Sequence, residues 1–92
     1  MYNSDKAILR LIDVLIFEKK IRFDFEFADS IGLLRPTLSK IKAGKNHFTP
    51  LHIEAVCLKY NVNANWIFGT QKNVFNDKKS IEISDFLLPK HR

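Results

Sequence analysis

Residues 27–44, FADSIGLLRPTLSKIKAG, have the spacing of two short helices joined by a tight turn. In the first half, Phe27, Ala28 and Ile31 stand at positions i, i+1 and i+4, which suits one buried helical face. Gly32 follows where a left-handed backbone would end that helix, because glycine adopts positive φ without a Cβ clash. The stretch therefore predicts a helix, a glycine turn and a second helix.

The second half of the stretch has an apolar side and a cationic side. Leu38 and Ile41 point inward at i and i+3, and Gly44 closes the run. The residues left on the outside are Arg35, Pro36, Ser39, Lys40 and Lys42. No acid stands among them, and such a face suits a helix laid into the major groove of DNA. We predict this helix over residues 35–43.

The same stretch resembles the helix-turn-helix of the phage repressor and Cro family, also called the xenobiotic-response-element-like family. The residues at the family's spacings are Ala28, Gly32, Leu33, Leu38, Ser39 and Gly44, followed by Pro50, Ile53, Val56, Cys57, Tyr60, Val62 and Trp66. The resemblance covers residues 5–69. It implies an all-α, five-helix lambda-repressor-like DNA-binding domain over residues 1–69, with a short C-terminal extension over residues 70–92.

Four residues depart from the family's pattern. Asp24 stands where the family often has a glutamine that helps to hold a phosphate, and an aspartate there would repel phosphate. Leu34 replaces the usual serine N-cap, so that capping hydrogen bond is missing. Pro36 is tolerated because it lies in the first helical turn, where its missing N–H costs nothing. Lys42 replaces the usual glutamate and makes the face more basic.

Helical spacing also covers the chain before this stretch. Apolar side chains repeat at i, i+3, i+4, i+7 and i+8, a strong amphipathic pattern formed by Ile8, Leu11, Ile12, Leu15 and Ile16. We predict a helix over residues 5–19, capped by Ser4 or Asp5.

Residues 23–27, FDFEF, alternate between apolar and acidic side chains, which is also the pattern of a half-buried strand. Five residues cannot form a sheet alone, and the chain offers no convincing partner strand. Helical spacing instead places Phe23 on one face with Phe27 and Ile31, and it puts two acids in a first turn that favours them. We predict a helix over residues 24–31, with Phe25 partly exposed.

The chain after residue 44 predicts two more helices. Thr49 as cap and Pro50 at the first helical position begin one of them, whose inner face is formed by Ile53, Val56, Cys57 and Tyr60. Asn63 caps a last short helix over residues 64–68, where we expect Trp66 and Phe68 to help close the core. Further along, Val74 and Phe75 are expected to fold back onto that core.

Length and charge limit the class of protein. The 92 residues make one domain, and the net charge of +5 with a pI of about 9.5 favours a polyanionic partner. All charges between residues 30 and 53 are positive, and they are Arg35, Lys40, Lys42 and Lys45. The single cysteine, Cys57, is expected to be a core thiol and fits a reducing cytoplasm. No membrane span or signal peptide is apparent, so we expect a cytoplasmic protein.

Enzymatic and metal chemistry are not indicated. His47 and His52 suggest a metal site, but the ligands near them are too few for a closed one. The serines, histidines and aspartates occupy caps, loops and exposed faces, and no glycine-rich phosphate loop is present. We expect neither an enzyme nor a bound metal, cofactor or small-molecule ligand.

The resemblance implies a sequence-specific double-stranded DNA-binding transcriptional regulator of bacterial or phage type, a repressor acting as a homodimer. The family's base-reading positions correspond to Arg35, Pro36 and Lys40. The residues expected at phosphates or the DNA backbone are Thr37, Ser39, Lys42, Lys45 and Asn46.

Two alternatives stay open. The C-terminal extension is too apolar for a simple disordered tail, so it is either packed on the domain or forms dimer contacts through Ile81, Ile83, Phe86, Leu87 and Leu88. The same five-helix fold also serves as an antitoxin or adaptor whose main partner is a protein. The acid-free face favours DNA, whereas Asp24, Leu34 and Pro36 count against it.

Overall fold

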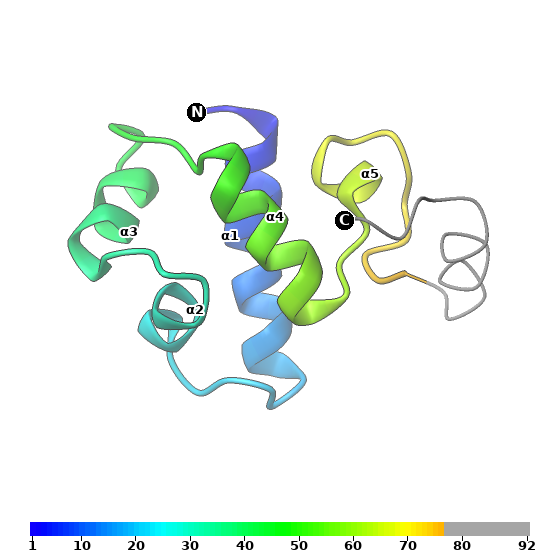
Figure 1. Cartoon of the computed structure of the whole chain (residues 1–92), viewed down its shortest axis with the longest axis horizontal. Coiled ribbons are helices and arrows are strands. Elements are labelled where there is room, and N and C mark those ends of the chain that lie inside the picture. The colour runs from blue at the N-terminus through cyan, green and yellow to red at the C-terminus, as the bar shows by residue number, and fades with distance from the viewer. Residues whose placement is uncertain (77–92) are drawn as a thin grey trace, which may run out of the picture.

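A computed structural model of the chain describes residues 1–76, and over this range the fold is all-α with five helices (Figure 1). The helices are α1 (Asn3–Phe17), α2 (Asp24–Ser30), α3 (Arg35–Lys42), α4 (Pro50–Tyr60) and α5 (Ala64–Ile67). In Figure 1, α2 and α3 lie on one side of the molecule and α5 lies on the other, with α1 and α4 between them. The helix predicted over residues 24–31 is confirmed, so the alternating FDFEF stretch is not a strand.

One hydrophobic core joins the five helices. Its fully buried apolar side chains include Ile8, Leu11, Leu15, Phe27, Ile41, Val56 and Ile67. Phe27 stacks on Tyr60 with ring centroids 5.6 Å apart, and the Tyr60 hydroxyl lies 2.6 Å from that of Ser30. These contacts attach α2 to α4. Because α3 packs in turn against α2, they also determine where α3 stands on the surface.

Several expectations about side chains were wrong, and Ile16, the last residue of the apolar pattern in α1, is 37% exposed. Neither Ser4 nor Asp5 is the N-cap of α1, because the helix begins earlier and its N-cap is Tyr2, whose backbone N–H the Asp5 side chain accepts. Phe23 is 54% exposed because it is the N-cap of α2 and lies outside the helical repeat that would turn it inward. Phe68 is 58% exposed because it follows the last turn of α5, whereas Trp66 does pack against the core.

The first turn of α2 is held by an acid. The Glu26 carboxylate accepts hydrogen bonds from the backbone N–H groups of Arg22 (2.7 Å) and Phe23 (2.9 Å). An acid at this point also suits the positive end of the helix dipole. The acids of FDFEF therefore serve a helix start, which explains why the alternating pattern does not produce a strand.

The turn between α2 and α3 has the left-handed backbone expected at glycine. Gly32 has φ +73°, and the N–H of Leu33 donates to the carbonyl of Ala28 across the turn at 2.9 Å. Leu33 itself is buried and closes the turn from inside, as an apolar plug. The turn therefore sets the angle between the two helices through one glycine and one buried leucine.

Replacing Gly32 by alanine is expected to lower the free energy of unfolding by about 1 kcal/mol. A Cβ at this position would meet no atom within 4 Å, so the cost comes from the positive φ alone. Asparagine tolerates that backbone better than alanine, so Gly32→Asn should cost less. Urea denaturation of both variants measures the two losses in free energy of unfolding. Equal losses would contradict the explanation that the positive φ of residue 32 is the sole cause.

The described chain ends beside α4 and α5. Val74 and Phe75 pack against the core as predicted, and an isolated antiparallel bridge pairs Phe75 with Val62. The backbone N–H of Asn63 donates to the carbonyl of Val74 at 2.8 Å. The dimer contacts predicted at Ile81, Ile83, Phe86, Leu87 and Leu88 lie outside the described residues. In residues 1–76, no helix has the length and apolarity needed to cross a membrane.

Candidate nucleic-acid interface

The outward side of α3 carries the three predicted base-reading residues. Leu38 and Ile41 are buried and hold the helix against the core, whereas Arg35, Pro36 and Lys40 are exposed. Ser39 is exposed between them, and we call Arg35, Pro36, Ser39 and Lys40 the outer face of α3. These four residues and Lys42 are all exposed, as the helical spacing predicted.

The residues predicted at phosphates occupy three different settings. Lys45 and Asn46 are exposed in the loop of residues 43–49 that follows α3. Lys42 is exposed in the last turn of α3, and Thr37 is half-buried beside the core. The missing N-cap is confirmed, since Leu34 makes no capping hydrogen bond and its side chain is exposed.

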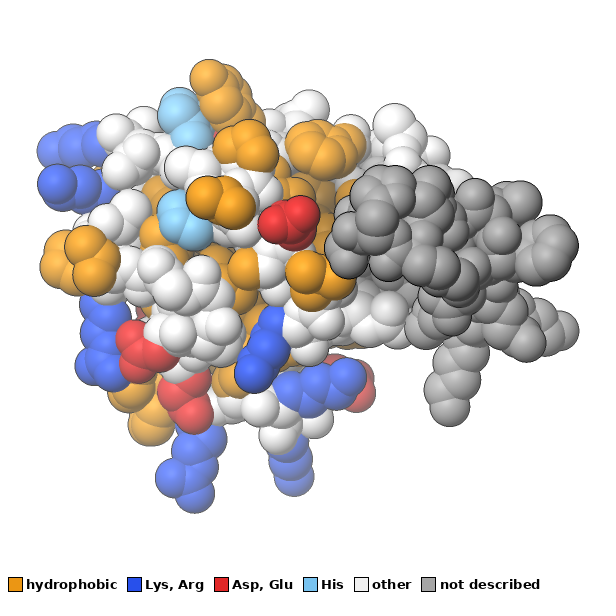
Figure 2. Space-filling view, viewed as in Figure 1, with side chains coloured by type: hydrophobic (Ala, Val, Ile, Leu, Met, Phe, Trp, Pro, Cys, Tyr) orange, Lys and Arg blue, Asp and Glu red, His pale blue; other side chains and the backbone are white. Residues whose placement is uncertain are grey.

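Basic side chains line the edge of the molecule that α3 occupies, but acids of α2 stand beside them (Figure 2). Asp29 accepts two hydrogen bonds from Arg35, at 3.2 Å from Nε and 2.6 Å from Nη2. The Arg35 guanidinium also lies over the ring of Phe25, 4.2 Å from its centroid. The face that is free of acids in the sequence is thus partly neutralised in space by the neighbouring helix.

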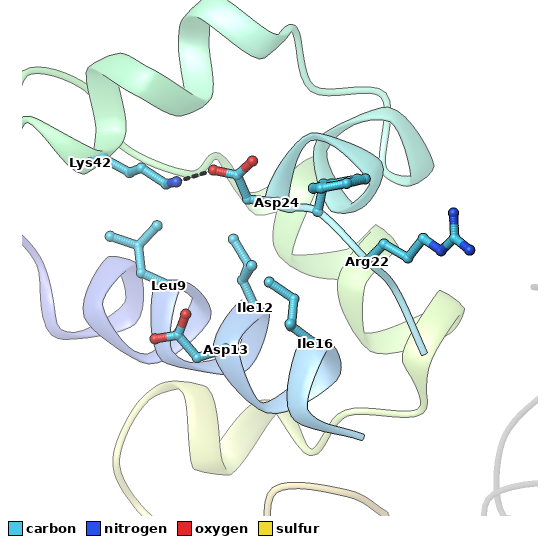
Figure 3. A pocket seen from close by; sticks show the side chains of 8 residues that line it. Leu9, Ile12, Asp13, Ile16, Arg22, Asp24 and Lys42 are labelled. Atoms are coloured by element: carbon cyan, nitrogen blue, oxygen red, sulfur yellow. Dashed lines mark hydrogen bonds and ion pairs between the residues drawn. The ribbon is translucent and has the colours of Figure 1, made fainter. Parts of the chain in front are cut away.

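A second ion pair joins the far end of α3 to the start of α2. Figure 3 shows the Lys42 ammonium and the Asp24 carboxylate pointing toward each other. The pair stands over a pocket of about 360 Å³ whose apolar lining from α1 is Leu9, Ile12 and Ile16. Asp24 is therefore matched by a cation within the protein, so the expected repulsion of phosphate by Asp24 is reduced.

Both carboxylates are ionised at neutral pH. The hydrogen bond from Lys42 holds the pKa of Asp24 below its ordinary value, and the bonds from Arg35 lower the pKa of Asp29 in the same way. The four side chains are 39–57% exposed, so solvent screens the pairs and they contribute little to stability. Among the described residues, Lys40 and Lys45 form no ion pair, which leaves them available to an anionic partner.

The loop after α3 is anchored by Asp5, a role that sequence analysis missed. The Asp5 carboxylate is fully buried, accepts the Phe48 backbone N–H at 3.0 Å and lies 2.6 Å from His47 Nδ1. It also accepts the backbone N–H of Tyr2 at 3.2 Å, and the Tyr2 ring stacks on His47 with centroids 3.8 Å apart. The first turn of α1 therefore fixes the loop that presents Lys45 and Asn46. The sequence indicated Asp5 only as a candidate cap at the start of the first helix, and it gave no sign of a partner 42 positions away.

The potential metal ligands of residues 1–76 and the thiol of Cys57 have the following surroundings. Within residues 1–76, no three His, Cys, Asp or Glu side chains gather in a way that could hold a metal ion. Cys57 is partly buried against the core, and this burial raises the pKa of its thiol. A raised pKa leaves less of the reactive thiolate at neutral pH.

Comparison with protein-family models, with curated proteins and with solved structures found no match.

Proposed function

We propose that this protein is a sequence-specific double-stranded DNA-binding transcriptional regulator, a repressor, that reads the major groove with α3. The observation that supports this is the outer face of α3, where Arg35, Pro36 and Lys40 project from a helix anchored by two buried residues. The same proposal assigns the five helices to the lambda-repressor-like fold and places the protein in the cytoplasm.

The dimensions of α3 suit the groove. An α-helix with its side chains is about 10–12 Å in diameter, which fits the major groove of B-DNA, about 12 Å wide. Arg35 at the N-terminal end reaches guanine O6 and N7, and Lys40 reaches a second base. Pro36 has no donor, so its contribution is an apolar contact such as one with a thymine methyl group.

The residues around the outer face position the helix on the DNA backbone. Lys45 and Asn46 approach the phosphates from the loop that Asp5 holds, and Ser39 and Thr37 add contacts from α3. The Lys42 ammonium is paired with Asp24, so Lys42 adds a further contact only if a phosphate displaces the Asp24 carboxylate. These contacts orient the protein and carry no sequence information.

Two copies reading two half-sites is the arrangement that the family resemblance implies. A single α3 reads only a few base pairs, so a homodimer on a two-fold-symmetric site is needed for useful specificity. Half-sites in such complexes lie about 34 Å apart, one turn of the double helix.

An apolar groove favours a second candidate, a protein-interaction module such as an antitoxin or adaptor. The groove has a volume of about 620 Å³ and lies between the first turn of α1, α4 and α5. Leu58 and Phe68 at its edge are 80% and 58% exposed. Exposed apolar patches of this kind often mark the contact surface for another protein.

Selection of genomic fragments by the purified protein, followed by affinity measurement over a range of salt, tests the proposed function. We expect enrichment of a two-fold-symmetric site. The logarithm of affinity should fall by about 0.9 per log unit of salt for each phosphate neutralised. Binding that does not change with salt, or no enrichment at low salt, would contradict DNA binding and favour the protein-interaction module.

A further inference from the structure

Arg35 is held on two sides by α2. Its Nε and Nη2 atoms donate to the two carboxylate oxygens of Asp29, and its guanidinium lies on the ring of Phe25. Phe25 is itself supported by Phe23, whose ring stacks on it at 5.2 Å. These contacts involve residues that lie outside α3, so the neighbouring helix sets the orientation of a residue on the outer face.

We propose that Asp29 and Phe25 are specificity-determining residues that hold Arg35 for end-on recognition of guanine. This inference rests on the proposed function. A guanidinium has two edges that each present a pair of parallel N–H groups, one formed by Nε and Nη2 and the other by Nη1 and Nη2. Asp29 occupies the first edge. The second edge makes no hydrogen bond with any residue in the range 1–76 and is the one left for a ligand.

The free edge selects one base by its donor pattern. Guanine presents two acceptors, O6 and N7, side by side in the major groove, which match two parallel N–H donors. Adenine offers N7 beside an amino group, cytosine offers an amino group, and thymine offers a single carbonyl beside a methyl group. An arginine that is free to rotate can turn either edge or a single N–H to these bases. Arg35 cannot rotate in this way while Asp29 and Phe25 hold it. The restraint therefore makes Arg35 selective for guanine.

The same restraint lowers affinity for DNA in general. The Asp29 carboxylate stands beside the groove-facing helix and is ionised, because the bonds from Arg35 lower its pKa. Its negative charge offsets the attraction of Arg35 for phosphates. Attraction between cationic side chains and phosphates is the main source of non-specific DNA binding. Asp29 therefore has two opposite effects, a gain in discrimination between bases and a loss in affinity for all DNA. A residue that merely stabilised α2 would have neither effect.

The variant Asp29→Asn separates these effects. It removes the charge and places an amide N–H₂ where the Arg35 edge needs an acceptor. The experiment measures affinity for the selected site, for the three single-base changes at the guanine read by Arg35, and for unrelated DNA. We expect discrimination at that guanine to fall about tenfold, because a misaligned bidentate contact loses much of its selectivity. Affinity for unrelated DNA should rise a few-fold, in line with one negative charge removed.

Two further variants complete the experiment. Asp13→Asn makes the same charge change at an exposed position of α1 and should leave discrimination unaltered. Phe25→Leu removes the ring beneath the guanidinium and should lower discrimination without changing the net charge. Thermal unfolding of each variant verifies that the domain remains folded. We expect Asp29→Asn to remain folded, because the Asp29 and Arg35 side chains are each more than half exposed.

The outcomes distinguish this inference from the proposed function. If Asp29→Asn raises affinity for all sequences equally, Asp29 only repels phosphates, and the inference fails while DNA reading by α3 stands. If Arg35→Ala leaves the guanine preference unchanged, Arg35 does not read that base, and the inference fails as well. If the unaltered protein shows no sequence preference, both the inference and the proposed function are wrong.

Discussion

The double variant Arg35→Ala with Lys40→Ala is expected to weaken binding to the selected site by about 2–5 kcal/mol. That corresponds to a loss of roughly 30-fold to several-thousand-fold in affinity. Each residue is exposed on the outer face of α3, and each is proposed to contact a base edge. Affinity for unrelated DNA should fall much less, because it depends on phosphates that other cations also neutralise. Titrations with both DNAs at one fixed salt concentration measure the two losses.

Matched variants show whether this loss belongs to α3. Arg10→Ala with Lys72→Ala removes the same two kinds of charge from exposed positions on α1 and on the segment of residues 70–76. That segment lies at the opposite end of the molecule from α3 (Figure 1), so binding should change little. Lys45→Ala, in contrast, should weaken binding to all sequences alike, as a phosphate contact does. A double variant that keeps its preference for the selected site would mean that another surface reads the bases.

Replacing Asp5 by alanine is expected to lower the free energy of unfolding by about 3 kcal/mol. The change leaves the buried Phe48 N–H without an acceptor and releases His47 from the first turn of α1. For a domain of this size, such a loss should lower the melting temperature by roughly 15 °C. Urea and thermal unfolding followed by circular dichroism give both quantities.

Three comparisons make the Asp5 result specific. Asp13→Ala, at an exposed position of the same helix, should change stability by less than about 0.5 kcal/mol. Asp5→Asn keeps one acceptor for the Phe48 N–H and should fall between the unaltered protein and Asp5→Ala. Because Asp5 fixes the loop that carries Lys45 and Asn46, Asp5→Asn should also weaken binding to all DNA. A loss of stability below about 1 kcal/mol in Asp5→Ala would contradict the anchoring role.

Much of the helical framework could be predicted from the sequence because the relevant signals are local. A run of apolar residues at helical spacing reports which side of a segment faces the core, as for Ile8 to Leu15 in α1 and for Leu38 and Ile41 in α3. Capping is equally local, and Thr49 and Asn63 do accept N–H groups at the starts of α4 and α5. Helical spacing failed at Phe23 and Phe68, which flank helices and so lie beyond the repeat that the spacing describes.

The sequence by itself determined the five helices, the glycine turn before α3 and the set of side chains on the outer face of that helix. Only the tertiary structure decided which charges meet. Asp29 and Arg35 are 6 positions apart in the chain, Asp24 and Lys42 are 18 apart, and Asp5 and His47 are 42 apart. Helical periodicity cannot reveal such pairs, because it reports the direction of a side chain from its own helix. Their partners depend on the angle at which α2 packs beside α3 and on where the loop after α3 returns to α1.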